Sequence, residues 1–218
     1  MPVVHVNDIE LFYERTGDGP AMLLVHGNGE DHTIFDRLIP LLASRYTVYA
    51  VDSRGHGRSS AVDSFDYGGM ADDMVALIEA LGLERPRFYG FSDGGIIGLM
   101  IAIRHPDLLS SLIVSGANVD PSGIRWIWRL PIRIQYRLTG DPKLKLMLEQ
   151  PHIPCSDLAC ITIPTTVTVG SRDVVSLSHT RMIARCIPSC RLLLFPGESH
   201  GSYVIHSDKL SALLLEPS

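Results

Sequence analysis

Short apolar runs alternate along this chain with longer segments in which apolar residues recur every three or four positions. Ala21–Val25 and Thr47–Val51 are runs of the first kind, which are typical of strands buried on both faces of a sheet. Residues 70–81 are of the second kind, with Met74 and Leu77 on the apolar side of an expected helix. Strands that alternate with helices form a mainly parallel sheet, whose right-handed crossovers place helices on both faces. The sequence therefore predicts an α/β fold.

The alternation continues to the end of the chain. Further strands are expected at Arg87–Phe91, 112–114, 165–169 and 191–195, and further helices at 33–43, 96–105, 174–186 and about 203–215. At the N-terminus, Val3–Val6 and residues 9–13 are β-rich runs joined by Asn7-Asp8, which predicts an antiparallel hairpin. We expect a mostly parallel central sheet of about eight strands, flanked by helices on both faces.

Composition limits the classes of protein that this chain can belong to. The 218 residues are 45% hydrophobic, which is enough for one domain with its own core and too apolar for a disordered protein. A net charge of −5 provides no general attraction for nucleic acid. We therefore expect a single domain over residues 1–218, either a monomer or a homodimer, that binds no nucleic acid.

No segment of the chain is typical of a membrane anchor or an export signal. The longest apolar stretch, residues 96–103, is far shorter than the roughly 18 residues of a membrane-spanning helix. The first residues, Met-Pro-Val-Val-His-Val, lack the basic start and apolar core of a secretory signal. The expectation is a cytoplasmic protein without stable membrane attachment.

Four cysteines lie in the last third of the chain, at positions 155, 160, 186 and 190. The gaps of four and three residues within each pair are wider than the two-residue gap of a usual zinc knuckle. We expect reduced thiols that act as small apolar residues, and no metal site.

The strongest chemical signal is Gly90-Phe91-Ser92-Asp93-Gly94, which lies between an expected strand and an expected helix. Glycines on both sides of a serine permit the tight, strained turn that projects its hydroxyl outward. The N-terminus of the following helix favours negative charge that develops beside it. Ser92 is therefore the candidate nucleophile.

A serine hydroxyl needs a base to take its proton, and the base needs an acid to orient it. His200 follows the last expected strand, and Asp173 follows the strand before it, so both lie at the same sheet edge as Ser92. We expect His200 to be the base and Asp173 the acid, with Asp120 as the second candidate acid. His26 lies in another glycine-rich loop at this edge, and we expect it to order that loop.

An oxyanion needs two backbone N–H donors that point at one place. The amide of Asp93 directly follows the nucleophile and supplies one. The loop His26-Gly27-Asn28-Gly29 follows a buried strand, and we expect the amide of Asn28 to supply the other.

Together these motifs resemble the α/β-hydrolase family over essentially the whole chain. The resemblance rests on five segments in chain order: 26–29, 52–59, 90–95, 170–173 and 197–200. It implies the triad order Ser92, Asp173, His200 and no cofactor or metal. A serine at position 92 argues against the haloalkane dehalogenase and epoxide hydrolase branches, which use aspartate there. It also implies a cap inserted after the strand at 112–114, here a short one at about 118–161.

The insert carries both tryptophans, Trp126 and Trp128, and we expect a second helix around 143–150. Arginines recur every four residues at 125, 129, 133 and 137, so several share one helical face. This face is either solvated opposite an apolar side, or the tryptophans line an acyl pocket or meet a partner. Membrane-surface binding is a third interpretation, although one short element attaches weakly.

The carboxylate of Asp93 leaves two interpretations open. It is either an acid in the first turn of a helix, stabilised by the helix dipole, or a pocket group that selects substrates with an ammonium group. The segment Ser-Asp-Gly-Gly is similar to the nucleophile turn of amino-acid-ester hydrolases within the family.

We therefore expect a serine hydrolase that cleaves small carboxylic esters through an acyl-enzyme intermediate, with Asp93, Trp126 and Trp128 in contact with substrate. An acyltransferase, a C–C bond hydrolase, an amidase or a cofactor-free perhydrolase would use the same triad. A non-catalytic ligand-binding protein on the same fold is the alternative from a different class.

Overall fold

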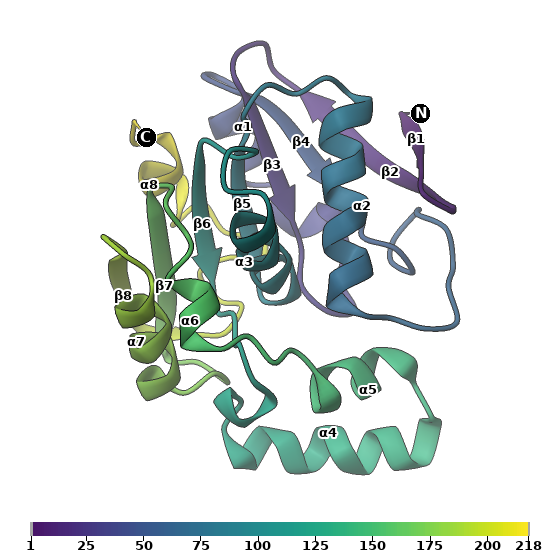
Figure 1. Cartoon of the computed structure of the whole chain (residues 1–218), viewed down its shortest axis with the longest axis vertical. Coiled ribbons are helices and arrows are strands. Elements are labelled where there is room, and N and C mark those ends of the chain that lie inside the picture. Colours follow the sequence, from purple (N-terminus) through teal and green to yellow (C-terminus); the bar gives the residue numbers. More distant parts are fainter. Residues whose placement is uncertain (1, 218) are drawn as a thin grey trace.

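The expected strands assemble into one mixed sheet. The computed structural model describes residues 2–217, and eight strands within them lie in the order β1-β2-β4-β3-β5-β6-β7-β8 (Figure 1). Their bounds are β1 Val3–Val6, β2 Ile9–Thr16, β3 Ala21–Val25, β4 Thr47–Val51, β5 Arg87–Phe91, β6 Ser111–Ser115, β7 Thr165–Arg172 and β8 Arg191–Ser199. The β1–β2 and β2–β4 pairs are antiparallel and the others are parallel. The predicted α/β fold and its N-terminal hairpin are confirmed.

Helices cover both faces of this sheet (Figure 1). The α-helices are α1 Ile39–Leu42, α2 Tyr67–Ala80, α3 Asp93–Arg104, α4 Trp126–Thr139, α5 Pro142–Glu149, α6 Cys155–Leu158, α7 Leu177–Cys186 and α8 Ser211–Leu215. Two 3₁₀ turns, η1 His32–Phe35 and η2 Pro121–Gly123, complete the set for the described chain. None of the helices in residues 2–217 is long and apolar enough to cross a membrane.

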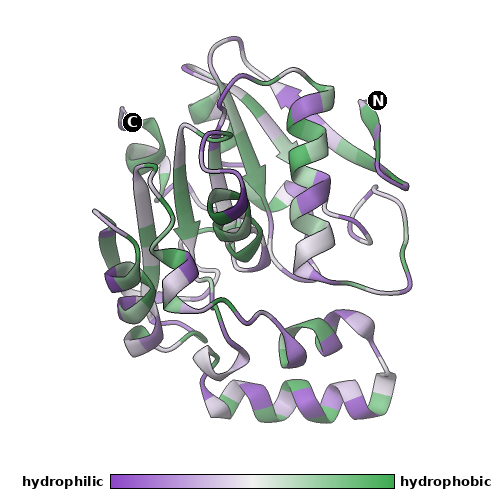
Figure 2. Ribbon diagram, viewed as in Figure 1, coloured by the Kyte–Doolittle hydropathy of each residue, from purple (hydrophilic) through white to green (hydrophobic). Residues whose placement is uncertain are grey.

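The alternation of side chains along the strands divides the core between the two faces. In β3, Leu23 and Val25 pack with α2 and α3, whereas Met22 and Leu24 pack on the opposite face. All four side chains have no exposed surface, as a strand buried on both faces requires. Figure 2 shows the central strands coloured mostly as hydrophobic, which is consistent with burial on both faces.

Two expected helices are much shorter than the sequence pattern indicated, and α7 begins three residues later than expected, at Leu177. The segment 33–43 forms η1 and the short α1 in place of one helix, because Pro40 has no N–H to continue a helical hydrogen-bond ladder. The segment 203–215 is helical only in α8, and His206 before it has a φ of 48°, which a right-handed helix excludes.

The last two strands are longer than expected and end directly before two of the candidate catalytic residues. β7 runs to Arg172 and β8 to Ser199, so Asp173 and His200 each directly follow a strand. The two strands are parallel neighbours, which brings their carboxyl ends to one edge of the sheet.

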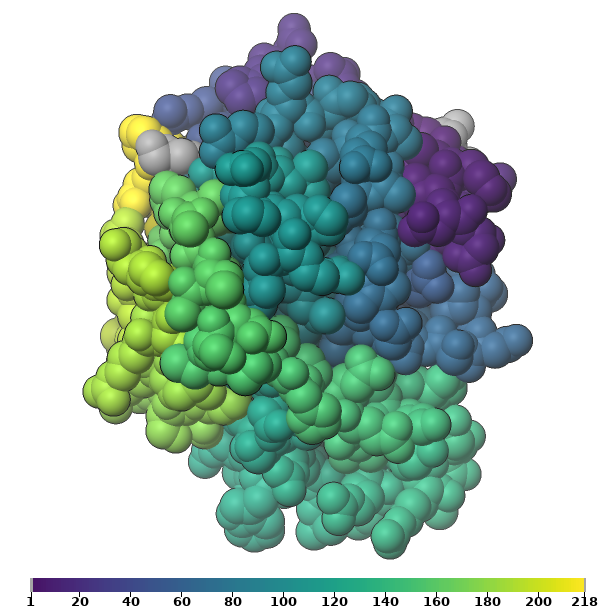
Figure 3. All heavy atoms as spheres, in the orientation of Figure 1, coloured from purple at the N-terminus to yellow at the C-terminus, as the bar shows by residue number. Residues whose placement is uncertain are grey.

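Helices α4 and α5 lie outside the sheet, and in the sequence they come between β6 and β7. In Figure 1 they cover the end of the sheet at which the parallel strands finish, and α4 lies beyond α5 at one end of the molecule's longest axis. The two helices correspond to the insert expected at about 118–161, and Figure 3 shows them as a separate layer against the body.

The cysteines differ from the expectation of four reduced thiols. Cys155 in α6 and Cys186 in α7 form a disulfide, whereas Cys160 and Cys190 are free. The two bonded cysteines are 31 residues apart in sequence, and packing of α6 against α7 brings them together. The expectation was wrong because sequence spacing does not show which distant segments become neighbours.

Candidate active site

Ser92 lies on a sharp turn between β5 and α3. Its φ of 52° and ψ of −113° are a strained combination for a residue with a side chain, and such strain is concentrated at functional sites. The turn depends on its two glycines. A Cβ on Gly94 would lie 2.1 Å from the carbonyl oxygen of Val25, and one on Gly90 would lie 2.1 Å from that of Gly94. The sequence motif therefore forms the strained turn that was expected of it.

Ser92, His200 and Asp173 form one chain of hydrogen bonds. Nδ1 of His200 lies 2.7 Å from Oδ1 of Asp173, and Nε2 of His200 lies 3.1 Å from Oγ of Ser92. The carboxylate accepts from Nδ1–H, which leaves the lone pair of Nε2 directed at the serine hydroxyl. Asp173 is buried and also accepts from the amide of Val175, so its carboxylate is held in place. The structure thus brings together the three residues that the sequence singled out.

The other candidate groups have different partners. Nε2 of His26 accepts from the amide of Ser53, so its Nδ1 carries the proton and donates to the carbonyl of Gly27 at 2.7 Å. Burial lowers the pKa of His26 to about 4, which keeps it neutral. His26 therefore orders its loop, as expected. Asp120 is paired with His152 at 2.9 Å and does not contact His200.

The loop after β3 lies against the serine. A Cβ placed on Gly27 would lie 3.0 Å from Cβ of Ser92. In this loop the amide of Gly27 is bound by Glu30 and the amide of Gly29 by His56. Within residues 2–217, the amides of Asn28 and Asp93 have no hydrogen-bond acceptor. These are the two backbone N–H donors that the sequence analysis predicted for an oxyanion.

The carboxylate of Asp93 is enclosed by protein groups. It is 4% exposed, one oxygen accepts from Nδ2 of Asn28 and the other from the hydroxyl of Tyr67, both at 2.9 Å. Burial raises its pKa, while these two hydrogen bonds oppose that rise. The arrangement matches the interpretation of Asp93 as an acid in the first helical turn. Tyr67 was missed because its only signal was an aromatic residue at the start of α2.

A pocket of about 460 Å³ opens over Ser92 and His200. Its wall is formed by the loop after β3, by the strand ends and by the two insert helices. The lining residues are Gly27, Asn28, Gly29, Glu30, Phe91, Ser92, Ile124, Trp128, Ile132, Asp141, Lys143, Leu144, Met147, Val174 and His200. Most of the wall is apolar, as is usual for a small-molecule site.

The two tryptophans do not share this pocket. Trp128 lines it, whereas Trp126 is 73% exposed and lies in a separate surface hollow with Arg129, Leu130 and Arg133. Two residues apart on a helix, the side chains point about 200° apart, so both cannot face the same pocket. The expectation that Trp126 lines the pocket was therefore wrong.

Glu30 is a pocket residue that the sequence analysis missed. One of its oxygens accepts from the amide of Gly27 at 3.0 Å, and the same oxygen would lie 2.8 Å from a Cβ on Gly27. The side chain thus folds back along the loop toward Ser92. Burial raises the pKa of Glu30 to about 7. Its position directly after Gly29, at a strand end, was the available signal.

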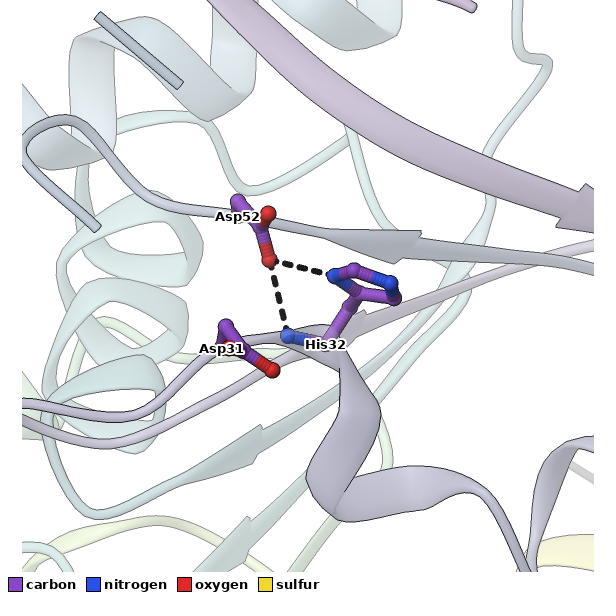
Figure 4. A group of neighbouring side chains, drawn as sticks. All are labelled: Asp31, His32 and Asp52. Atoms are coloured by element: carbon purple, nitrogen blue, oxygen red, sulfur yellow. Dashed lines mark hydrogen bonds and ion pairs between the residues drawn. The ribbon is translucent and has the colours of Figure 1, made fainter. Parts of the chain in front are cut away.

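One cluster of acidic and histidine side chains has the composition of a metal site. Ligand atoms of Asp31, His32 and Asp52 lie within 4.8 Å of one another (Figure 4). Each carboxylate already accepts hydrogen bonds. Asp52 accepts from the backbone amide and ring of His32 at 2.8 and 2.7 Å, and Asp31 accepts from the amide of Thr33. The hydrogen bonds of this cluster join the loop after β3 to the loop after β4.

Comparison with known proteins agrees with this geometry. A family model described as alpha/beta hydrolase fold matches residues 20–138. The chain is 28% identical to serine hydrolase BPHL of Homo sapiens over 242 residues, covering 96% of this chain and 83% of that protein. It is 40% identical to fluoroacetate dehalogenase of a Burkholderia species over 118 residues, which cover 51% of this chain and only 39% of that protein.

A solved structure shows the same fold over nearly the whole chain. The esterase RhEst1 from Rhodococcus sp. ECU1013 superposes with a TM-score of 0.81 at 21% identity, covering 97% of this chain and 95% of that one. The family model covers more than half of the 218 residues. The chain belongs to the α/β-hydrolase fold family, as its motifs predicted, and is a serine hydrolase of that fold.

Proposed function

We propose that this serine hydrolase cleaves small carboxylic esters through an acyl-enzyme intermediate. The observation that carries the proposal is the hydrogen-bonded chain of Ser92, His200 and Asp173 at the base of an apolar pocket. Beside it are two backbone amides that have no acceptor in the described part of the chain. A nucleophile, a base, an orienting acid and an oxyanion site are the four parts that acyl transfer needs.

Each of these groups acts at a defined step of the proposed ester hydrolysis. Oγ of Ser92 attacks the acyl carbon while Nε2 of His200 takes the hydroxyl proton, and the amides of Asn28 and Asp93 hold the oxyanion. When the tetrahedral intermediate collapses, His200 gives the proton to the leaving alcohol and the acyl group remains on Ser92. Water, deprotonated by His200, attacks this ester and releases the acid. Asp173 holds Nδ1–H throughout and stabilises the imidazolium.

The size and lining of the pocket favour small, largely apolar acyl groups. Its volume of about 460 Å³ is at the low end of small-molecule sites. Among the apolar lining residues, Trp128 and Ile132 come from α4 and Leu144 and Met147 from α5. Phe91, Ile124 and Val174 complete the apolar wall. The short insert therefore supplies most of the apolar wall of the proposed site.

If the enzyme prefers esters with an amino group, Glu30 is the carboxyl group that would meet the ammonium. Both oxygens of Asp93 are engaged by Asn28 and Tyr67, and Asp93 does not line the pocket. Glu30 does line it, and only one of its oxygens is bound within residues 2–217. A matched panel of α-amino and neutral esters tests this. Glu30→Gln should reduce the preference for the cationic ester, and Asp93→Asn should not.

The triad is tested with short-chain nitrophenyl esters. Ser92→Ala and His200→Ala should each lower kcat by roughly 10³-fold or more. His152→Ala is the matched control, because His152 is also paired with an aspartate but lies outside the pocket. Equal loss in His152→Ala and His200→Ala would contradict the assignment.

Labelling separates the enzyme from a ligand-binding protein on the same fold. A fluorophosphonate should form one adduct, at Ser92, in folded protein and none in His200→Ala. Product analysis with added alcohol, amine or peroxide then separates hydrolysis from acyl transfer, because the triad defines the nucleophile and leaves the acceptor open.

A further inference from the structure

Helix α4 is exposed along its whole length. None of its residues is buried. Among residues 2–217, six of the nine exposed large apolar side chains belong to this one helix: Trp126, Ile127, Trp128, Leu130, Ile134 and Leu138. Leu138 is 81% and Ile134 is 50% exposed. Single exposed apolar residues are ordinary, but a concentration of them on one element marks an interaction surface.

Four of these six side chains form a stripe on the outer side of the helix. Ile127, Leu130, Ile134 and Leu138 are spaced by three, four and four residues, which places them on one face. The opposite face points inward, because Ile132 lines the pocket and Tyr136 is half-buried. The outer stripe is therefore separate from the part of α4 that forms the candidate active site.

The same helix is basic in an acidic protein. Residues 125–139 contain four arginines and no acidic residue, whereas the rest of the chain has 24 acidic and 15 basic side chains. Arg133 and Arg137 flank the apolar stripe, since each precedes one of its members by one residue on the helix. A partner for this face must therefore combine an apolar region, into which the stripe can insert, with negative charge.

The position of α4 allows a flat surface to reach it. The helix lies across one end of the longest axis of the molecule, and in this view no other element extends beyond it (Figures 1 and 3). We propose that the outer face of α4 binds reversibly to the surface of an anionic phospholipid bilayer. Its apolar stripe would enter the headgroup boundary, and its arginines would meet lipid phosphates, as in other interfacial helices.

A second copy of the chain fits this face less well. The stripe is about 17 Å long and about 10 Å wide, so it offers roughly 170 Å² to a partner. This area is well below the roughly 800 Å² per partner of a stable interface. Two copies packed through their stripes would also bring arginines together without an acidic residue from either α4.

Vesicle co-sedimentation tests the proposal with the full chain. The wild type should bind phosphatidylcholine vesicles that contain about one third phosphatidylglycerol, and bind pure phosphatidylcholine at least tenfold more weakly. Arg133→Gln with Arg137→Gln should weaken binding to anionic vesicles roughly 25-fold, since each basic residue contributes about a factor of five at such a surface. Added salt should weaken wild-type binding.

Ile134→Glu with Leu138→Glu should abolish binding. Leu41→Glu with Leu194→Glu is the matched control, because these two side chains are 42% and 44% exposed but lie on other elements. The control pair should bind like the wild type. Circular dichroism and a thermal unfolding curve should show all variants folded.

The proposal is wrong if the wild type does not sediment with anionic vesicles at low salt, or if the two glutamate pairs lower binding equally. It is also wrong if lipid-free protein forms a dimer in analytical ultracentrifugation that Ile134→Glu with Leu138→Glu dissociates, because α4 would then be covered by a second copy.

Discussion

The side-chain amide of Asn28 donates to the carboxylate of Asp93 across 2.9 Å. This bond joins the two residues whose own backbone amides have no acceptor within residues 2–217. The two residues lie 65 positions apart in the sequence, on the loop after β3 and at the start of α3. The bond fixes the distance between the two proposed oxyanion donors before substrate arrives, and preorganised donors cost nothing to orient during the reaction.

Exchange of this donor and acceptor provides the first prediction. Asn28→Asp should lower kcat on the order of 10²-fold with a smaller effect on KM, because two facing carboxylates repel and move the amides apart. The double variant Asn28→Asp with Asp93→Asn restores a donor and an acceptor, and should recover part of the lost kcat. Steady-state kinetics on a nitrophenyl ester provide the measurement. No recovery in the double variant would show that the bond does not position the amides.

The second prediction concerns Gly116, which lies behind the imidazole ring. It has a φ of 63°, and a Cβ on it would lie 2.8 Å from Cε1 and 2.9 Å from Nδ1 of His200. Gly116→Ala should push the ring away from Ser92 and lower kcat about 10- to 100-fold, since a shift of about 1 Å can cost 10²-fold.

Gly140 provides a control with matched backbone strain. Its φ is 67°, but a Cβ there would meet nothing within 4 Å. Alanine at either position costs about 1 kcal/mol through the left-handed backbone. Urea unfolding should therefore show a stability loss from this strain in both variants, while esterase assays should show a kcat loss only in Gly116→Ala. A comparable kcat loss in Gly140→Ala would contradict the explanation.

The juxtaposition of Ser92, Asp173 and His200 could be predicted because it depends on topology. Parallel strands finish at one edge of a sheet, so residues that directly follow them become neighbours wherever the strands lie in the sequence. The same argument placed Asn28 next to Asp93. It works without knowledge of any side-chain direction.

The features that the sequence did not predict depend on packing between distant segments. The direction of the Asp93 carboxylate is determined by Tyr67, which comes from another helix. The pairing of Cys155 with Cys186 depends on how α6 docks on α7. Whether Trp126 or Trp128 faces the pocket depends on the rotation of α4 about its axis, and a regular helical pattern does not specify that rotation.

The third prediction is a pH dependence of stability due to Glu30. Its pKa rises from the usual 4.5 to about 7 on folding, mainly through burial. The hydrogen bond from the amide of Gly27 and the nearby His200 oppose this rise, whereas Asp93 and Asp31 add to it. Between these two pH values the folded chain holds a proton that the unfolded chain has lost. This contribution to stability is therefore present at low pH and is lost as the pH rises through 7, by at most about 3 kcal/mol.

The variant Glu30→Gln has no titrating carboxyl group at this position. Comparison with the wild type therefore isolates the contribution of Glu30 to the pH dependence of stability. The free energy of unfolding of the wild type minus that of Glu30→Gln should fall between pH 5 and pH 8, as urea titrations at several pH values would measure. Other titrating groups, such as His26, are common to both proteins and largely cancel in the difference. A difference that stays constant or rises with pH would show that Glu30 is ionised throughout.

The fourth prediction concerns the disulfide between α6 and α7. Cys155–Cys186 closes a loop of 31 residues. A disulfide that closes a loop of this length stabilises the folded protein by about 3–4 kcal/mol, because it restricts the unfolded chain. Cys155→Ser should lower the free energy of unfolding by about that amount, and a reductant should have the same effect on the wild type. Cys160→Ser is the control and should change little, because Cys160 is free and exposed. Alkylation of the unreduced, denatured wild type should modify two cysteines, and modification of all four would contradict the pairing.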